Sequence, residues 1–166
     1  MKTLCLLRHA HSDPAPSRDV DDHDRTLSAR GEQEAQNVGA FMKEQRIVPD
    51  AMLCSSSLRT KETARIAFDV IFGSRNEVAS RFTRDLYLAP PEIIVDEIRT
   101  ADDDRSCLLV VGHNPGFEDL AEKLAQANGE MIGKFPPAAM AVFTCNTGKW
   151  RDFSARQAKL KLVFMP

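Results

Sequence analysis

Short apolar runs alternate along the chain with longer segments in which apolar residues recur every three or four positions. The short runs predict buried strands, and the longer spacing predicts amphipathic helices. The predicted strands are 4–7, 51–54, 107–111 and 138–145, with a weaker one near 78–82. The predicted helices run from the N-cap Ser28 to about residue 45, and over 58–72, 89–98 and 117–127. Because strands and helices alternate, we expect a three-layer α/β/α fold with a mostly parallel central sheet.

Turn-forming residues separate these elements, and they predict a loop near the start of the chain and a turn near its end. Prolines and aspartates between residues 14 and 24 predict an acidic loop after the first strand. Near the other end, 146–148 predicts a hairpin turn into 149–153, and 160–164 is either a last strand or an extended tail. The 166 residues contain no repeat or linker, so we expect one domain over 1–166.

Composition limits the classes of function. The 22 basic and 24 acidic residues give a net charge of −2, which argues against a nucleic-acid or membrane-surface partner. No apolar run approaches the roughly 18 residues that span a bilayer, and the opening run is too short for a signal peptide, so we expect a cytoplasmic protein. The four cysteines are isolated from one another, which predicts free thiols and no structural metal.

Chemically distinctive residues follow three of the predicted strands. Arg8 and His9 end the first, Ser55 ends the second with Arg59 one turn into the next helix, and His113 follows the third. If these strands are parallel, their carboxyl ends open on one edge of the sheet, where α/β folds bind ligands. Guanidinium groups bind phosphoryl oxygens bidentately, one imidazole can attack phosphorus, and a second can stabilise charge. This edge therefore predicts a phosphoryl-transfer site that needs no metal or cofactor.

The same segments resemble the histidine phosphatase superfamily. Its signature, Arg-His-Gly or Arg-His-Ala at the end of the first strand, matches residues 8–10. Residues 24–31, 55–64 and 111–116 resemble further family elements in the expected order, and 134–141 is similar to a late segment of the small SixA-type phosphohistidine phosphatases. The resemblance implies a phosphoglycerate mutase-like fold, small and without a large cap domain.

The resemblance also implies roles for individual residues. It makes His9 the nucleophile that carries a phosphohistidine intermediate, and it makes Arg8, Arg59 and His113 the groups that bind the phosphoryl group. The implied substrate is a phosphohistidine-carrying protein of a signalling or phosphotransfer system. A small-molecule phosphomonoester is the alternative substrate on the same fold.

The general acid and two secondary residues are less determined by the sequence. Asn114 stands where one branch of the family carries an acid, which leaves Asp85 and Asp13 as candidates. A phosphoramidate tolerates a weak acid because imidazole leaves more readily than an alkoxide. Ser55 either contacts phosphate or caps the following helix, and Arg25 either lines the mouth of the pocket or pairs with the neighbouring aspartates.

Two other classes of function compete with this interpretation. His9 and His11 have the spacing of a metal-binding pair, with Asp13 and His113 as further ligands of a metal-dependent hydrolase. The adjacent Arg8 would repel such a cation, and otherwise His11 is predicted, like His23, to be an exposed loop residue. A phosphate-binding module without catalysis is the third class, although binding alone would not need both histidines.

Overall fold

One six-stranded sheet forms the centre of the molecule in a computed structural model that describes residues 1–15, 17–73 and 77–166. The strand order is β3-β2-β4-β1-β5-β6. The strands are β1 (Lys2–Arg8), β2 (Ala51–Ser55), β3 (Ala79–Thr83), β4 (Cys107–Gly112), β5 (Met140–Cys145) and β6 (Ala158–Phe164). β1, β2, β3 and β4 pair in parallel, whereas β5 pairs antiparallel with β1, and β6 pairs antiparallel with β5. The mostly parallel sheet expected from the sequence is confirmed.

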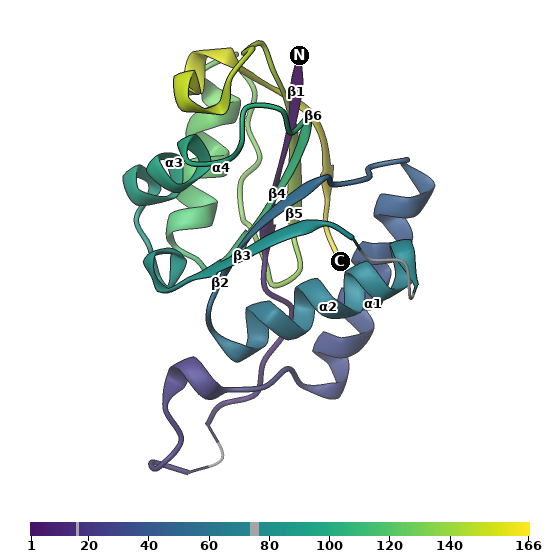
Figure 1. Ribbon diagram of the computed structural model, residues 1–166. Helices are drawn as coiled ribbons and strands as arrows, with labels where there is room; N and C mark the ends of the chain where they lie inside the picture. Colours follow the sequence, from purple (N-terminus) through teal and green to yellow (C-terminus); the bar gives the residue numbers. More distant parts are fainter. Residues whose placement is uncertain (16, 74–76) are drawn as a thin grey trace.

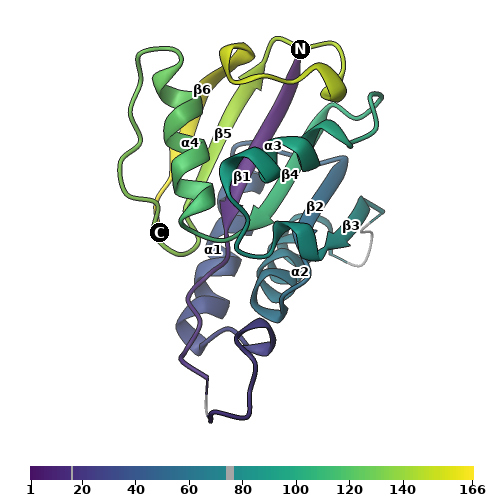
Figure 2. The same cartoon turned by 90° about the vertical axis from the view of Figure 1, so that its left-hand side faces the viewer.

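Two pairs of helices cover the two faces of this sheet. α1 (Ala29–Glu44) and α2 (Leu58–Phe72) pack on one face, and α3 (Pro91–Arg99) and α4 (Gly116–Gln126) pack on the other. Figures 1 and 2 show the pairs on opposite sides of the strands. The fold therefore has the three α/β/α layers that the alternating pattern predicts. No helix within the described ranges is long and apolar enough to cross a membrane.

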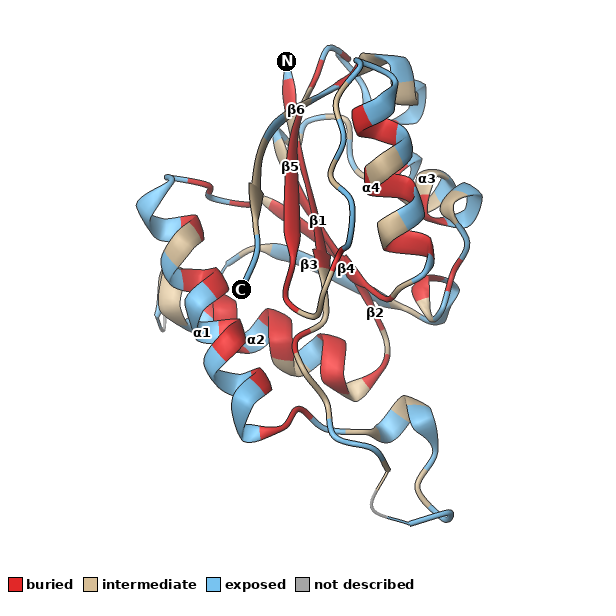
Figure 3. Ribbon diagram, turned by 180° about the vertical axis from the view of Figure 1, so that it is seen from behind, coloured by how far each residue is buried: buried red, intermediate tan, exposed pale blue. Residues whose placement is uncertain are grey.

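The strands at the centre are apolar on both faces, as expected for a sheet covered on both sides. Along β1, Leu4 and Leu6 pack toward α3 and α4, while Cys5 and Leu7 pack toward α1 and α2. All four are fully buried, and Figure 3 shows the buried residues gathered along the middle strands. Burial of each leucine side chain contributes about 1.5–3 kcal/mol to stability. A charged or polar side chain is consequently expected only where a strand leaves this core.

The parallel register brings three strand ends to one edge of the sheet. Arg8 at the end of β1 lies opposite Gly112 at the end of β4, and Cys54 near the end of β2 lies opposite Val111. We call this the carboxyl edge of the sheet. The residues that directly follow β1, β2 and β4 therefore start from neighbouring positions in space.

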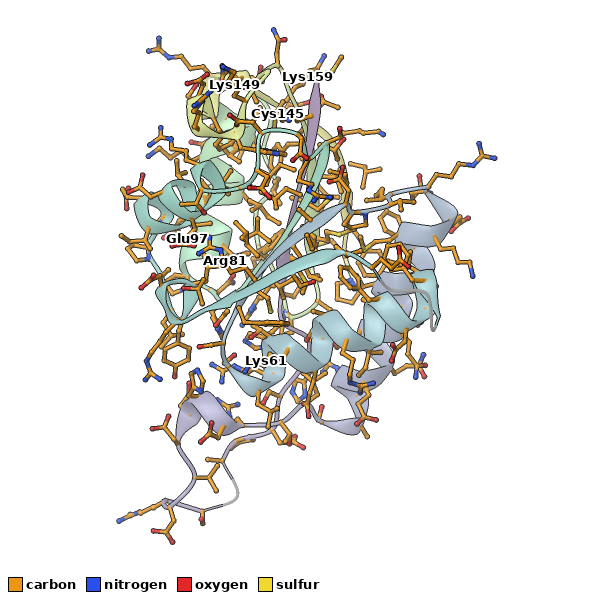
Figure 4. The ribbon with its side chains drawn as sticks, viewed as in Figure 1. Lys61, Arg81, Glu97, Cys145, Lys149 and Lys159 are labelled. Atoms are coloured by element: carbon orange, nitrogen blue, oxygen red, sulfur yellow. The ribbon has the colours of Figure 1, made fainter. Side chains whose placement is uncertain are left out.

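An ion pair ties the outermost parallel strand to the helix layer. Arg81 of β3 extends toward Glu97 of α3, and the guanidinium nitrogen lies 2.7 Å from the carboxylate oxygen (Figure 4). Residues 79–83 of β3 lie mostly exposed at the sheet edge, so little apolar burial defines this strand. This explains why the sequence predicted it only weakly, although its position agrees with the prediction to within one residue.

The sequence prediction was wrong about the chain after β5. The segment 149–153 does not form the returning hairpin strand, because Trp150–Asp152 is a short 3-10 helix and β6 pairs with β5 instead. The Trp150 side chain is fully buried and donates its indole N–H to the Arg105 carbonyl, 2.9 Å away. Anchoring that ring turns the chain away from the sheet. β5 also begins at Met140 rather than Ala138, whose φ of +60° breaks the strand geometry.

The acidic segment between β1 and α1 folds back along the carboxyl edge. We call residues 11–28, Pro16 excepted, the strap, and Figure 1 shows it at the bottom of the view in purple. Its ends are fixed where the Ser28 N–H donates to the His11 carbonyl at 3.1 Å. Gly31 in α1 makes this closure possible, since a Cβ there would lie 1.9 Å from the His11 carbonyl oxygen. A short 3-10 helix, η1 (Asp22–Asp24), lies within the strap.

Candidate active site

Three of the predicted site residues meet at the carboxyl edge of the sheet. The rings of His9, after β1, and His113, after β4, have centroids 5.2 Å apart. The guanidinium of Arg59, from the first turn of α2, lies against both rings. Its Nε is 3.4 Å from Nε2 of His9, and its Nη2 is 3.4 Å from Nδ1 of His113. The structure thus brings together side chains from three separate segments, as the strand topology predicts.

Hydrogen bonding fixes which nitrogen of His9 faces the site. Nδ1 lies 2.7 Å from the Ala10 carbonyl oxygen, and a carbonyl only accepts, so Nδ1 carries the proton. Nε2 therefore holds a lone pair directed at Arg59. Burial and, to a smaller extent, the nearby charges of Arg59 and Arg8 together lower the pKa of His9 to about 4, although the bond to Ala10 opposes them. At neutral pH His9 consequently presents an uncharged, nucleophilic nitrogen.

His113 is held in a buried polar environment. Its Nε2 lies 2.8 Å from Oγ of Ser55 and 3.4 Å from Oγ of Ser57, and both serines are completely buried. Because Arg59 donates toward Nδ1, the Nε2 proton is donated to Ser55. Burial, together with the neighbouring His9 and Arg59, holds the pKa of His113 well below the usual range of an imidazole. The ring is therefore neutral and its orientation is determined by hydrogen bonds.

Ser55 lies at the end of β2, just before the N-terminus of α2. Its hydroxyl contacts His113, while Ser57 occupies the N-cap position of α2 without a side-chain capping bond. Ser57 instead lies 2.8 Å from the Thr60 hydroxyl. Ser55 thus fixes the orientation of the His113 ring through the ring nitrogen that points away from Arg59.

Arg8 lies beside the two histidines, at the end of β1. One of its Nη1 protons is donated to the Phe135 carbonyl at 2.9 Å, and the Asn114 amide donates to the same oxygen at 2.9 Å. Its buried Nε–H has no hydrogen-bond partner within the described part of the chain. Arg8 therefore retains donor capacity that the protein itself does not use.

The structure adds two residues that sequence reasoning missed. The carboxylate of Asp22, in η1 of the strap, accepts from Nη2 of Arg59 at 3.0 Å and from the hydroxyl of Tyr87 at 2.6 Å. The Tyr87 ring packs edge-on against His113, with centroids 5.3 Å apart. The cluster of aspartates in the strap was visible in the sequence, but no spacing distinguished Asp22 from its neighbours.

Two smaller predictions about the strap have different outcomes. Arg25 pairs with an aspartate, which is one of the two alternatives that the sequence left open, with 2.8 Å between its Nη1 and Oδ1 of Asp22. His23 was predicted to be exposed, which is wrong. Its ring is half-buried, packs 5.0 Å from the Tyr87 ring and lies within 2.9 Å of the Ser56 hydroxyl. Docking of η1 against the protein body accounts for this burial.

The two general-acid candidates, Asp85 and Asp13, have exposed side chains. The Asp85 carboxylate is 3.3 Å from the Thr83 hydroxyl. Among the residues that the structure describes, no hydrogen bond or ion pair joins either carboxylate to His9 or His113.

The metal-binding alternative depends on His11, which has a different partner. Nδ1 of His11 is 2.7 Å from the Ser28 hydroxyl, and its backbone N–H donates to Glu34. Within residues 1–15, 17–73 and 77–166, no three His, Cys, Asp or Glu side chains form a group that could hold a metal ion.

The cluster combines a neutral imidazole nitrogen, a second imidazole and two guanidinium groups above a parallel sheet. Guanidinium groups match the charge and geometry of phosphoryl oxygens, and a neutral imidazole can form a bond to phosphorus. Fold and site together define an enzyme class that handles phosphoryl groups with histidine and arginine side chains.

Comparison with known proteins agrees with this class. The family model described as histidine phosphatase superfamily (branch 1) matches residues 4–73. An uncharacterized protein of Mycobacterium tuberculosis is 35% identical over 96% of this chain and 99% of its own length. A solved structure described as a proposed phosphohistidine phosphatase SixA from Nakamurella multipartitia is 27% identical, with a TM-score of 0.83 over 99% of this chain and 96% of that one. SixA complexed with tungstate shares the fold, with a TM-score of 0.75 at 19% identity over 97% of this chain and 95% of that one.

The chain belongs to the histidine phosphatase superfamily, in its SixA-type branch, and is a phosphatase. The phosphoglycerate mutase-like fold implied by the sequence resemblance is confirmed.

Proposed function

We propose that this phosphatase hydrolyses phosphohistidine in proteins, through a phosphohistidine intermediate on His9 and without a metal ion. The observation that carries the proposal is the paired orientation of His9 and Arg59. Nδ1 of His9 is bonded to a backbone carbonyl, so its Nε2 lone pair faces the guanidinium that would hold the phosphoryl oxygens. A nucleophile and an anion-binding group thus converge on one point.

The proposed reaction has two steps. Nε2 of His9 forms a bond to phosphorus while the bond from phosphorus to the leaving nitrogen breaks, and the leaving imidazole takes the electron pair and a proton from solvent. A water molecule then attacks phosphorus, and the bond to His9 breaks to release inorganic phosphate. Arg8, Arg59 and His113 would bind the equatorial oxygens in both steps and stabilise their developing charge.

The arrangement of carboxylates supports phosphohistidine as the substrate. Asp22 is the carboxylate that reaches Arg59, but bonds from Tyr87, Arg25 and Arg59 hold its pKa well below its usual range. Asp22 is therefore ionised and cannot supply a proton at neutral pH. The other candidates, Asp85 and Asp13, form no hydrogen bond or ion pair with the two histidines among the residues that the structure describes. A phosphoramidate needs less protonation of its leaving group than a phosphoester, which favours the protein substrate.

The name of a structural relative points in the same direction. The Nakamurella protein is described as a proposed phosphohistidine phosphatase, and its fold matches over nearly the whole chain. We extend that substrate class to this chain as part of the proposal. The cytoplasmic location predicted from the sequence stays a prediction.

A substrate panel with a nucleophile variant tests the proposal. Wild type and His9→Ala are compared on a phosphohistidine-carrying protein, p-nitrophenyl phosphate and sugar phosphates. We expect the highest kcat/KM on the phosphohistidine protein, no turnover in His9→Ala, and acid-labile phosphate on wild-type protein after quenching. Preference for a small phosphoester would instead favour the phosphomonoesterase alternative, and turnover by folded His9→Ala would contradict the nucleophile assignment.

Chelation separates the proposal from the metal-dependent alternative. We expect full activity after dialysis against EDTA, because arginine and histidine side chains supply the positive charge. Loss of activity that zinc or magnesium restores would support a metal-dependent hydrolase.

A further inference from the structure

The guanidinium of Arg59 uses two different edges for two sets of partners. One edge, Nε and Nη2, faces Nε2 of His9 and Nδ1 of His113, each at 3.4 Å. The other edge, Nη1 and Nη2, faces Asp22, with the backbone carbonyl 2.5 Å from Nη1 and the carboxylate 3.0 Å from Nη2. Asp22 therefore contacts Arg59 twice while leaving the edge toward the histidines open to a ligand.

Asp22 is itself fixed by groups on both sides. The Tyr87 hydroxyl donates to its Oδ2 at 2.6 Å, and Nη1 of Arg25 donates to its Oδ1 at 2.8 Å. Arg25 also donates to the backbone carbonyls of Ser12 and Asp13, at 3.1 and 2.8 Å, which joins the two limbs of the strap. The carboxylate thus occupies one defined position relative to the body of the protein.

The base of the strap is anchored by two helices. Glu34 of α1 accepts the His11 backbone N–H at 2.9 Å, and Glu62 of α2 accepts the Leu27 backbone N–H at 2.7 Å. Arg59 lies three residues before Glu62 on the same helix. Glu62 therefore attaches the base of the strap to the same helix that carries Arg59.

We propose that Asp22 is a positioning residue that holds Arg59 with its Nε and Nη2 edge toward the two histidines, ready to bind a phosphoryl group bidentately. This inference rests on the proposed function. A bidentate contact needs both donors to be oriented before the ligand arrives, and a long arginine side chain without a second partner would lose rotamer freedom on binding. Asp22 of the strap is that partner, and the hydrogen bond from Tyr87 holds the Asp22 carboxylate in place.

The opposite role for Asp22 would be that of an internal competitor. A carboxylate on Arg59 could occupy the place of phosphate, so that its removal would tighten phosphate binding. The geometry favours positioning, because the edge of Arg59 that faces Asp22 differs from the edge that faces His9 and His113. The two roles predict changes of opposite sign in the dissociation constant.

The test measures binding of inorganic phosphate and of tungstate by titration calorimetry. We expect Asp22→Asn to weaken binding about tenfold, the scale of one lost hydrogen bond to a charged group. Tyr87→Phe, which keeps the ring against His113, should weaken binding by a smaller factor. Asp19→Asn is the matched control, since it removes the same charge from an exposed position on the strap. Its binding should stay within about twofold of wild type, the size expected for a distant surface charge.

A double-mutant comparison shows whether Asp22 acts through Arg59. In an Arg59→Ala background, Asp22→Asn should have no further effect on phosphate binding. In wild-type background, the Nε–H resonance of Arg59 in ¹⁵N-labelled protein should shift and broaden when Asp22 is replaced. Tighter or unchanged binding by Asp22→Asn, or an equal loss in the Arg59→Ala background, would overturn the inference.

Steady-state kinetics separate this inference from the proposed function. If wild-type protein binds phosphate but hydrolyses neither phosphohistidine nor phosphoesters, the proposed function is wrong. The binding measurements then still decide whether Asp22 positions Arg59. Full wild-type activity, together with unchanged phosphate binding in Asp22→Asn, would reject the role of Asp22 alone.

Discussion

The charge of His9 gives a quantitative test of the site. Burial, with the nearby guanidinium groups, lowers the pKa of His9 to about 4, whereas a free imidazole titrates near 6.5. At pH 5.5 a pKa of 4 leaves about 97% of the ring neutral, and a pKa of 6.5 would leave about 9%. The two cases therefore differ roughly tenfold in the fraction of competent nucleophile.

An imidazole NMR titration measures this directly and needs no substrate. The Cε1–H signal of His9 is assigned by its loss in His9→Asn and followed from about pH 8 to about pH 4.5. We expect it to keep the chemical shift of a neutral ring down to about pH 5. A midpoint near 6.5 would refute the argument that burial and the arginines control this residue. Arg59→Gln should raise the midpoint, because it removes a positive charge that opposes protonation.

The same pKa predicts how stability depends on pH. Between about pH 6.5 and pH 4 the unfolded chain protonates His9 and the folded chain does not, so the free energy of unfolding falls as pH falls. From pH 7 to pH 5 the contribution is at most about 2 kcal/mol, and partial exposure of the ring reduces it. Urea denaturation of wild type and His9→Asn at both pH values isolates the effect from that of His113, which has the same sign. Equal pH dependence in the two proteins would contradict this assignment.

Two further predictions concern residues that support the site, Ser55 beside His113 and Gly31 beside the strap. Ser55→Ala should lower kcat/KM about tenfold, because the buried Nε2–H of His113 loses its 2.8 Å acceptor. An unchanged kcat/KM would show that Ser55 does not orient the ring. Gly31→Ala should lower the free energy of unfolding by about 2–3 kcal/mol, since its Cβ would lie 1.9 Å from the His11 carbonyl oxygen. Gly148→Ala is the control, with no atom within 4 Å of the added Cβ, and an equal urea midpoint for the two variants would argue against the clash.

The fold was predictable where burial determines it. The central strands are apolar on both faces, so their position in the sequence follows from composition alone, and the alternation with helices gives the parallel topology. Prediction failed after β5, where the outcome depends on Trp150. Its indole reaches Arg105, 45 residues earlier in the chain, and no local pattern encodes such a contact.

The histidine–arginine cluster was predictable for a related reason. Arg8 and His113 stand at or directly after the ends of buried strands, where a charged or polar side chain has no place in the core. Once the strands are parallel, their ends must share one edge of the sheet. Topology alone therefore brings these residues together, whatever the conformation of the loops.

The positions of Asp22 and Tyr87 could not be predicted in this way, because neither residue stands at the end of a strand. Several aspartates occur in the strap, and only the docking of η1 decides which one reaches Arg59. That docking depends on the backbone bonds that Glu34 and Glu62 accept from the strap, and on the space that Gly31 leaves beside His11. The residues proposed to react are thus set by strand topology, whereas the residue proposed to position Arg59 is set by tertiary contacts. Substitutions in the strap base should accordingly affect phosphate binding through Asp22.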